Sequence, residues 1–234
     1  MAAHEPPARA ALDDPAAAAA ALTIAILGGT GDQGRGLARR LGLAGNRVII
    51  GSRDPARADR AAATVGSPPL VTGASNEEAA SAGDVVIAAI PWVGHRELLA
   101  GLAGPLAGKI LIDCVNPLGF DARGAYPIRV EEGSAAEQAA RVLPGSTVVG
   151  AFHHVSATVL LDPEVAEVGL DVMVLGDDRR ATDLVQALAS RISGMRGIYA
   201  GRLRNCAQVE ALTANLISVN RRYKAHAGLR VTDV

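Results

Sequence analysis

The segment Gly28–Gly36 has the glycine spacing of a turn that binds a dinucleotide. The glycines of its pattern G-x-G-x-x-G and the residues between them are Gly29, Thr30, Gly31, Asp32, Gln33 and Gly34. Glycine lets the backbone turn sharply and approach a pyrophosphate, whose charge is favoured by the unpaired N–H groups and the dipole of the next helix. The segment therefore predicts cofactor binding; the alternative is a tight turn without a ligand.

The flanks of this segment favour a ligand. An apolar run at 23–27 precedes it and helical spacing at 37–43 follows it, which is the strand, turn and helix context that makes the pattern informative. A nucleotide hydrolase would have Lys and then Ser or Thr after the last glycine, where this chain has Arg35 and Gly36. We therefore expect a dinucleotide at this turn.

A hydroxyl and two guanidinium groups follow the second expected strand, 47–51. An NAD site places Asp or Glu there, about 20 residues after the first strand. This chain has glycine instead, then Ser52 and Arg53, with Arg57 one helical turn later. Because Arg offers a phosphate paired, charge-assisted hydrogen bonds, these residues favour NADP over NAD. Two alternatives stay open: a solvated basic helix face, and a shifted register that makes Asp54 the acid of an NAD site.

Alternating strands and helices are expected around these segments. Apolar runs at 84–90, 109–113 and 147–151 are typical of central strands in a parallel sheet that is covered on both faces. Segments with helical spacing, 93–102 and 134–143, separate them, and a shorter strand is expected at 70–72, before a capping box formed by Ser75 and Glu78. The pattern predicts an α/β fold with a doubly wound parallel sheet.

Ligands of such sheets lie beyond the carboxyl ends of the strands. The candidates at these ends are Pro91, Trp92, Asn116, Pro117, Leu118, His153 and His154. Trp92 could present a flat apolar wall to a ring system or could simply fill the core. Adjacent histidines leaving a strand point to opposite faces, so at most one of the pair is expected in the site. No acidic partner stands at metal-ligand spacing, and we expect no metal.

The last third of the chain is expected to form a small α+β unit. A strand at 171–175, a helix from Asp178 to 190, a brief strand at 198–200 and a long final helix capped by Asn205 are indicated. Arg202 and Arg204 lie beside that cap, where the helix dipole favours an anion. The alternative is a satisfied helix end with solvated arginines.

Composition narrows the function classes. A net charge of −1 over 234 residues, with charges of both signs interspersed, lacks the electrostatic footprint of a nucleic-acid binder. No apolar run approaches the roughly 20 residues of a membrane span. Two distant cysteines, Cys114 and Cys206, indicate a reducing, cytoplasmic compartment rather than a disulfide framework. The Ala- and Pro-rich start, with its acidic pair, predicts a disordered tail over residues 1–21 and no secretory signal.

Together these segments resemble the NADPH-dependent reductases of coenzyme F420, a deazaflavin. The resemblance runs from Thr23 almost to Val234. It rests on the motifs Ile26-Leu27-Gly28-Gly29-Thr30-Gly31, Gly51-Ser52-Arg53, Ile90-Pro91-Trp92, Ala151-Phe152-His153, Leu203-Arg204-Asn205 and Glu210-Ala211-Leu212-Thr213.

The resemblance implies a homodimer with an NADP-binding Rossmann domain at 22–152, a small C-terminal domain at 153–234, and coenzyme F420 in the cleft between them. Residues matched to the NADP 2′-phosphate are Thr30, Ser52, Arg53 and Arg57, and those matched to the nicotinamide are Ile90, Pro91 and Trp92. Arg204 and Asn205 lie in a segment that varies among members. The N-terminal tail has no counterpart.

The implied reaction moves a hydride between NADP(H) and the deazaflavin, and it needs no protein acid or base. We therefore expect no catalytic side chain, only residues that hold the two rings together and exclude water. Two rivals stay open. One is a reductase of a small carbonyl or imine metabolite, for which Lys224 is the only lysine in the last third of the chain. The other is a non-catalytic NADP(H)-sensing module.

Overall fold

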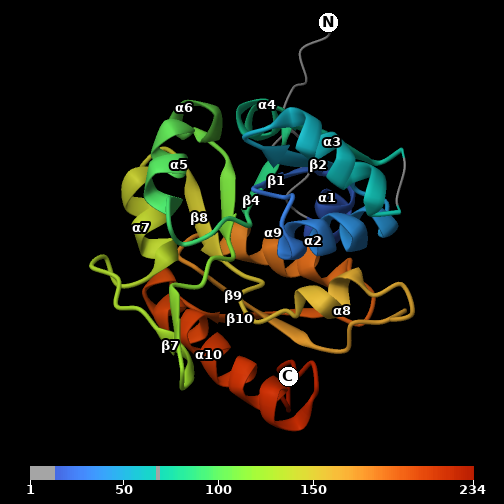
Figure 1. The fold of residues 1–234 in the computed structure, drawn as a ribbon. Helices are drawn as coiled ribbons and strands as arrows, with labels where there is room; N and C mark the ends of the chain where they lie inside the picture. Colours follow the sequence, from blue (N-terminus) through green and yellow to red (C-terminus); the bar gives the residue numbers. More distant parts are fainter. Residues whose placement is uncertain (1–13, 67–68) are drawn as a thin grey trace, which may run out of the picture.

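One mixed sheet forms the centre of the protein. The computed structural model describes residues 14–66 and 69–234, and within them eight strands pair in the order β3-β2-β1-β4-β5-β8-β9-β10 (Figure 1). The strands are β1 (Thr23–Leu27), β2 (Arg47–Ser52), β3 (Val71–Ser75), β4 (Val85–Ala88), β5 (Ile110–Asp113), β8 (Thr147–Gly150), β9 (Asp171–Gly176) and β10 (Arg196–Gly201). Each neighbouring pair is parallel except β8 and β9. The doubly wound α/β fold expected from the sequence is confirmed.

Helices cover both faces of this sheet. Those contributing buried residues to one face are α1 (Pro15–Ala21), α2 (Asp32–Leu43), α3 (Pro55–Thr64), α8 (Ala157–Leu161) and α9 (Arg179–Ser190). Those on the other face are α4 (Asn76–Ala82), α5 (His95–Gly101), α6 (Ala103–Leu106), α7 (Ala135–Val142) and α10 (Cys206–Tyr223), the last preceded by a short 3₁₀ turn, η2 (Leu203–Asn205).

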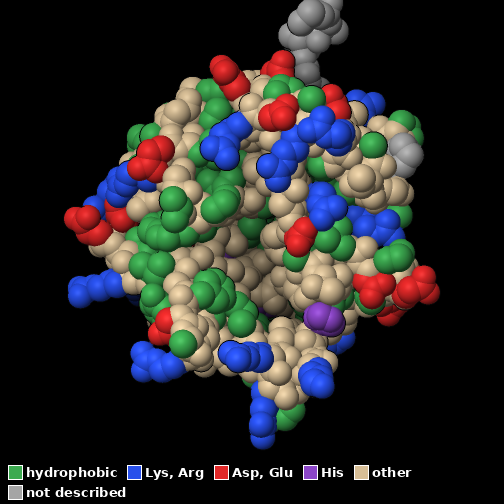
Figure 2. Space-filling view, in the orientation of Figure 1, with side chains coloured by type: hydrophobic (Ala, Val, Ile, Leu, Met, Phe, Trp, Pro, Cys, Tyr) green, Lys and Arg blue, Asp and Glu red, His purple; other side chains and the backbone are tan. Residues whose placement is uncertain are grey.

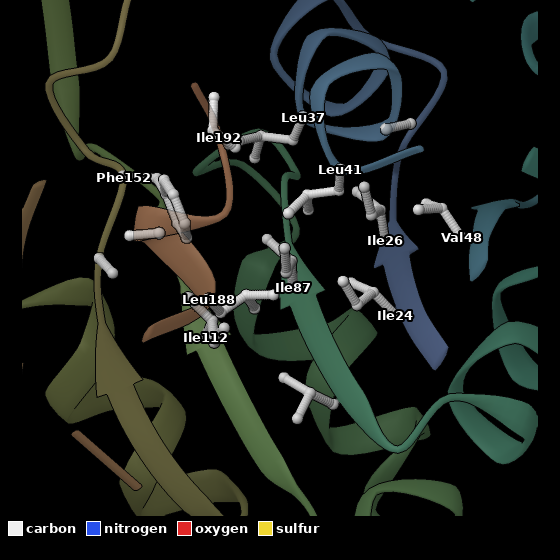
Figure 3. Packing of buried hydrophobic residues seen from close by; sticks show 14 of the residues in the cluster. Ile24, Ile26, Leu37, Leu41, Val48, Ile87, Ile112, Phe152, Leu188 and Ile192 are labelled. Atoms are coloured by element: carbon white, nitrogen blue, oxygen red, sulfur yellow. The ribbon is translucent and has the colours of Figure 1, made fainter. Parts of the chain in front are cut away.

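The two faces follow from the period of two along each strand. In β1, Ile24 and Ile26 point to one face, whereas Ala25 and Leu27 point to the other. Figure 3 shows Ile24 and Ile26 of β1 near Ile87 of β4, with Leu37 and Leu41 of α2 above them in this view and Leu188 of α9 beside Ile112 of β5. Because both faces are buried, the central strands read as continuous apolar runs.

The N-terminal prediction needs a correction. Residues 15–21 were expected to belong to a disordered tail, but they form α1, whose Ala18 and Ala19 are buried. The Asp14 side chain accepts hydrogen bonds from the N–H groups of Ala16 and Ala17, and Pro15 occupies the first turn, so residues expected in a disordered tail start a helix. Residues 1–13 of the expected tail lie outside the described part.

The C-terminal strands extend the main sheet. β9 pairs antiparallel with β8, through Val149 with Gly176 and Gly150 with Leu175, and β10 pairs parallel with β9. The expected α+β unit therefore shares its sheet with the first part of the chain. A domain boundary at residue 152 stays a prediction.

Of two helix caps predicted from the sequence, one is present and one is not. The capping box is confirmed: the N–H of Glu78 donates to Ser75 Oγ over 3.1 Å, and the Glu78 carboxylate accepts from the Ser75 N–H over 3.0 Å. The cap expected at Asn205 is wrong, since its side chain makes no capping bond and the residue ends a 3₁₀ turn. A two-stranded hairpin, β6 (Leu118–Asp121) with β7 (Gly124–Pro127), was not predicted.

Candidate functional site

A cleft of about 820 Å³ opens at the carboxyl ends of the parallel strands. Figure 2 shows the molecule hollowed near the middle of this face, with hydrophobic side chains gathered beside the hollow and Lys or Arg side chains above it. The residues that line the cleft are Gly28, Thr30, Gly31, Asp32, Gln33, Ser52, Arg53, Asp54, Arg57, Asn76, Ala89, Ile90, Pro91, Trp92, Val93, Gly94, Leu98, Cys114, Val115, Asn116, His153, Val155 and Thr213.

The glycine turn forms one end of the cleft. Gly28 has φ +62°, and a Cβ there would stand 2.6 Å from Ile90 Cγ2, so only glycine fits without strain. A Cβ on Gly34 would lie 2.5 Å from Gly29 Cα, because α2 crosses directly over the turn. Gly31 precedes α2 without a side-chain cap. The first N–H groups of α2 are therefore left for a ligand.

Ser52, Arg53 and Arg57 meet at the adjoining rim. Ser52 is buried and its Oγ accepts from the Asp54 N–H over 3.2 Å, whereas both arginines are exposed. Within residues 14–66 and 69–234, no ion pair involves either guanidinium group. Asp54 is instead the N-cap of α3, where its carboxylate accepts from the Arg57 N–H over 3.3 Å.

The opposite wall is apolar. Ile90, Pro91 and Trp92 follow β4 and line the cleft together, and Gly94, with φ +87°, turns the chain into α5. Trp92 is half-buried, and its ring lies 5.6 Å from the ring of His95, measured between centroids. Trp92 is therefore a wall of the cleft rather than a filler of the core.

Polar atoms without a partner mark the floor of the cleft. Asn116 Nδ2 donates to the His153 carbonyl over 2.7 Å, but Asn116 Oδ1 and both ring nitrogens of His153 are buried and unpaired among the described atoms. Burial lowers the pKa of His153 to about 4, so its ring is neutral at neutral pH, with one nitrogen a donor and the other an acceptor. Unpaired buried polar atoms are costly, which makes these atoms candidates for bonding a polar ligand.

The second histidine turns away from the cleft. His154 Nε2 accepts from the Met173 N–H of β9 over 3.3 Å, and burial lowers its pKa to about 4 as well. Only His153 of the pair lines the cleft, as expected for adjacent residues leaving a strand.

Some predicted site residues lie elsewhere. Gly29 and Gly34 are packed beneath the turn rather than on the cleft surface. Pro117 is buried behind the cleft and starts the hairpin, with its carbonyl accepting from the Ile128 N–H over 2.8 Å. Arg204 and Asn205 do not line the cleft either.

Other lining residues were missed from the sequence. Asn76 is buried, and its Oδ1 accepts from the Gly28 N–H over 3.2 Å, which holds the start of the glycine turn. Thr213 comes from α10, and its Oγ1 donates to the His153 carbonyl over 3.1 Å. The position of Asn76 directly after β3 was a usable signal, but nothing local marks Thr213. Cys114, whose Sγ donates to the Ala88 carbonyl, has a raised thiol pKa because it is fully buried.

The described residues contain neither a cluster of metal-ligating side chains nor a helix that could span a membrane. No group of three or more His, Cys, Asp or Glu side chains among them could hold a metal ion. None of their helices is long and apolar enough to cross a membrane.

Known proteins match the chain over most of its length. A sequence model of the family described as "NADP oxidoreductase coenzyme F420-dependent" matches residues 23–117. The F420-dependent NADP reductase of Methanothermobacter thermautotrophicus is 41% identical over 224 residues, which cover 91% of this chain and 96% of that protein. The chain belongs to the F420-dependent NADP oxidoreductase family. The F420-dependent NADP reductase of Methanocaldococcus jannaschii is 39% identical over 224 residues, which cover 91% of this chain and 99% of that protein.

A solved structure agrees with the family assignment. The 1.70 Å crystal structure of a candidate F420-dependent NADP reductase from Arthrobacter sp. FB24 superposes with a TM-score of 0.74 at 28% identity, over 90% of this chain and 99% of that one. The match therefore spans most of this chain and nearly the whole of the other. The resemblance inferred from the sequence motifs is confirmed.

Proposed function

We propose that this protein transfers a hydride between NADP(H) and coenzyme F420 in the cleft at the carboxyl ends of the strands. The observation that carries the proposal is the continuity of one cleft from a hydroxyl and guanidinium rim to an apolar wall. The rim suits an anionic group, and the wall beside Trp92 suits a flat ring. The names printed for the family and its members pair the same two cofactors.

The residues present fit the adenosine end of NADP. The uncapped start of α2 and the close approach of Gly29 and Gly34 leave space and donors for a pyrophosphate. Arg53 and Arg57, exposed and without an ion-pair partner in the described part, can both turn to a 2′-phosphate beside Ser52 and Thr30. Asp54 is occupied as a helix cap, which argues against its use as the acid of an NAD site.

The other end of the cleft fits a nicotinamide and a second ring. When bound, the two cofactors supply the hydride donor and acceptor carbons themselves. The chain has to orient the rings and exclude water, tasks that suit Ile90, Pro91 and Trp92. The unpaired His153 nitrogens and Asn116 Oδ1 can bond the amide and carbonyl groups of such rings.

No proton transfer to a substrate is required of this site. At the Trp92 end, the titratable side chains that line the cleft are Cys114 and His153. Burial keeps both neutral, since it raises the thiol pKa and lowers the imidazole pKa. A reductase of a carbonyl or imine would usually need a proton donor there.

We propose further that Pro117, Arg204 and Asn205 contact the edge of the deazaflavin site.

We also propose that the protein is a cytoplasmic homodimer. The dimer is supported by large apolar side chains that stay exposed on the β6–β7 hairpin and on α10, with which β7 packs. They are Phe120, Tyr126, Val219 and Tyr223. Light scattering of the eluting protein tests the dimer: a mass of one 23.9 kDa chain would exclude it.

The decisive experiment follows deazaflavin absorbance in a stopped assay with purified protein, NADPH and oxidised coenzyme F420, and with NADH in parallel. We expect rapid loss of absorbance with NADPH and little with NADH. Binding of NADPH without any loss of absorbance would overturn the proposed reaction. Equal rates with NADH would overturn the assignment of the Ser52 and Arg53 rim.

A further inference from the structure

A buried ion pair lies directly behind the Trp92 wall. His95 is the first residue of α5, and Asp113 is the last residue of β5. His95 Nε2 stands 2.7 Å from Asp113 Oδ2, and both side chains are 0% exposed. The pair lines no part of the cleft.

The second ring nitrogen of His95 also faces an oxygen. His95 Nδ1 lies 2.9 Å from Gln138 Oε1 of α7. The orientation of that amide is fixed, because Gln138 Nε2 donates to the Glu132 carboxylate over 3.2 Å. A neutral imidazole has one N–H and could satisfy only one of two acceptors. A proton on both nitrogens satisfies both contacts with Asp113 as a carboxylate, so the geometry favours an imidazolium ring at His95.

The charged groups around the ring come from several elements. Asp113 is in direct contact, Glu210 of α10 lies nearby, and Glu132 pairs with Arg96. Burial lowers the pKa of His95, but the hydrogen bond and charge of Asp113, with Gln138 and Glu210, outweigh it and leave the pKa raised. The Trp92 ring, 5.6 Å away, adds a cation–π contact.

The pair connects the two segments that enclose the ring end of the cleft. Asp113 Oδ1 accepts from the Val115 N–H over 2.9 Å, which fixes the turn that carries Asn116. The backbone N–H of His95 donates to the Trp92 carbonyl over 3.1 Å, and the His95 ring packs on the Trp92 ring. The salt bridge therefore connects the Trp92 wall to the Asn116 turn beyond the point where the pairing of β4 with β5 ends.

We propose that His95 is a positioning residue which, as a buried imidazolium bonded to Asp113, holds Trp92 at a fixed distance from Asn116 and so sets the position of the reacting ring. The kinetic part rests on the function proposed above. The structural part does not, because Trp92 is the only tryptophan of the chain and reports on its own position.

The first test measures the protonation of His95 and the environment of Trp92 without any enzymatic turnover. Nitrogen-15 spectra of the histidine rings are compared between the wild type and His95→Gln, which identifies the signals of His95. We expect both His95 nitrogens to carry protons at neutral pH. In His95→Gln, and in the double variant His95→Gln with Asp113→Asn, Trp92 emission shifts to the red and acrylamide quenches it more. A neutral His95, or unchanged Trp92 emission in both variants, would overturn the proposal.

The second test separates positioning from loss of stability. Leu99→Val is the matched control, because Leu99 is buried in α5 but does not line the cleft and carries no polar group that could bond the pair. We expect the His95 variants to lose at least about tenfold in kcat, since misplaced reactants react slowly, while the KM for NADPH stays within about twofold. Leu99→Val should lower Tm and leave kcat and emission unchanged. Equal loss of kcat in Leu99→Val would reduce His95 to a structural role.

If the wild type fails to reduce coenzyme F420, the spectra and the fluorescence still decide the structural part. The double variant covers the case in which His95→Gln alone does not fold, because it removes both charges and leaves no unpaired carboxylate. Failure of the positioning proposal and failure of the proposed function are therefore distinguishable.

Discussion

Gln33 and Phe152 are joined by a hydrogen bond from Gln33 Nε2 to the Phe152 carbonyl, 3.3 Å long. Phe152 is fully buried and has φ +63°, the left-handed region that a bulky residue rarely adopts. Gln33 belongs to the first turn of α2, and His153 directly follows Phe152. The bond therefore connects the glycine turn to the histidine on the floor of the cleft, and it helps hold a strained residue in place.

We predict that Gln33→Met lowers the free energy of unfolding by about 1 kcal/mol, since it removes one of the two donors to the Phe152 carbonyl and leaves only the Val155 N–H. For a chain of this size that corresponds to a drop of roughly 2–4 °C in Tm. The thioether has nearly the same length, so packing is kept. Gln208→Met, on the exposed side of α10, is the control and should leave Tm unchanged. Equal Tm values for both variants would refute a stabilising role for this bond.

Arg53→Ala should weaken NADPH binding by about 2 kcal/mol, or roughly 30-fold, because a paired charge-assisted contact to the 2′-phosphate is lost. The KM for coenzyme F420 should change little, and so should any weak activity with NADH. Arg60→Ala is the matched control: this arginine is also exposed on α3, but it does not line the cleft. The measurement is KM for each substrate in each variant, and similar effects on both cofactors would contradict the assignment of the rim.

Glu210 should make stability depend on pH. Its carboxylate accepts from the N–H groups of Ala135 and Ala136, but burial, with the charge of Asp113 nearby, raises its pKa from 4.5 to about 7. Between these values the folded state binds more protons than the unfolded state, so the contribution of Glu210 to stability falls as pH rises, by up to roughly 3 kcal/mol. Urea unfolding at pH 5 and pH 8 should show a smaller pH effect in Glu210→Gln than in the wild type.

His153 should act in the opposite direction. Its folded pKa of about 4 lies below the ordinary value of 6.5, so the unfolded state binds the extra proton first and stability is lost as pH falls between those values. We predict that His153→Asn gains stability relative to the wild type when the pH is lowered from 8 to 5. The same variant should lower turnover, because it removes a ring that faces the cleft. A pH-independent difference in unfolding free energy would mean that the imidazole has the same pKa in the folded and the unfolded protein, and it would contradict the prediction.

The parallel core and the cofactor turn were readable from the sequence because both depend on local patterns. Ile24 to Leu27 and Val85 to Ala88 are apolar at every position, which a strand buried on both faces requires. The glycine turn is marked by residue types that the backbone itself demands. Ser52 and Arg53 were found for a similar reason, since they stand at a fixed place after a strand.

The parts that were missed depend on distant contacts. Asp14 and Pro15 resemble a chain break until the alanines after them find α9 to pack on. Thr213 reaches the His153 carbonyl from a helix that begins more than 50 residues later in the chain. Asn205 matched a cap by residue type, but a 3₁₀ turn takes the place of the extended residue that a cap needs. Composition and spacing carry no information on such pairings.

The packing of α1 on α9 has a consequence for the order of folding. The two helices are the first and the ninth along the described chain, so the ribosome must release most of the protein before α1 finds its partner. Until then Ala19 and Leu22 have no α9 surface to cover them. Contacts of such long sequence separation form late and slow the search for the native state. The amides of α1 and α9 should therefore become protected from hydrogen exchange together, late in folding.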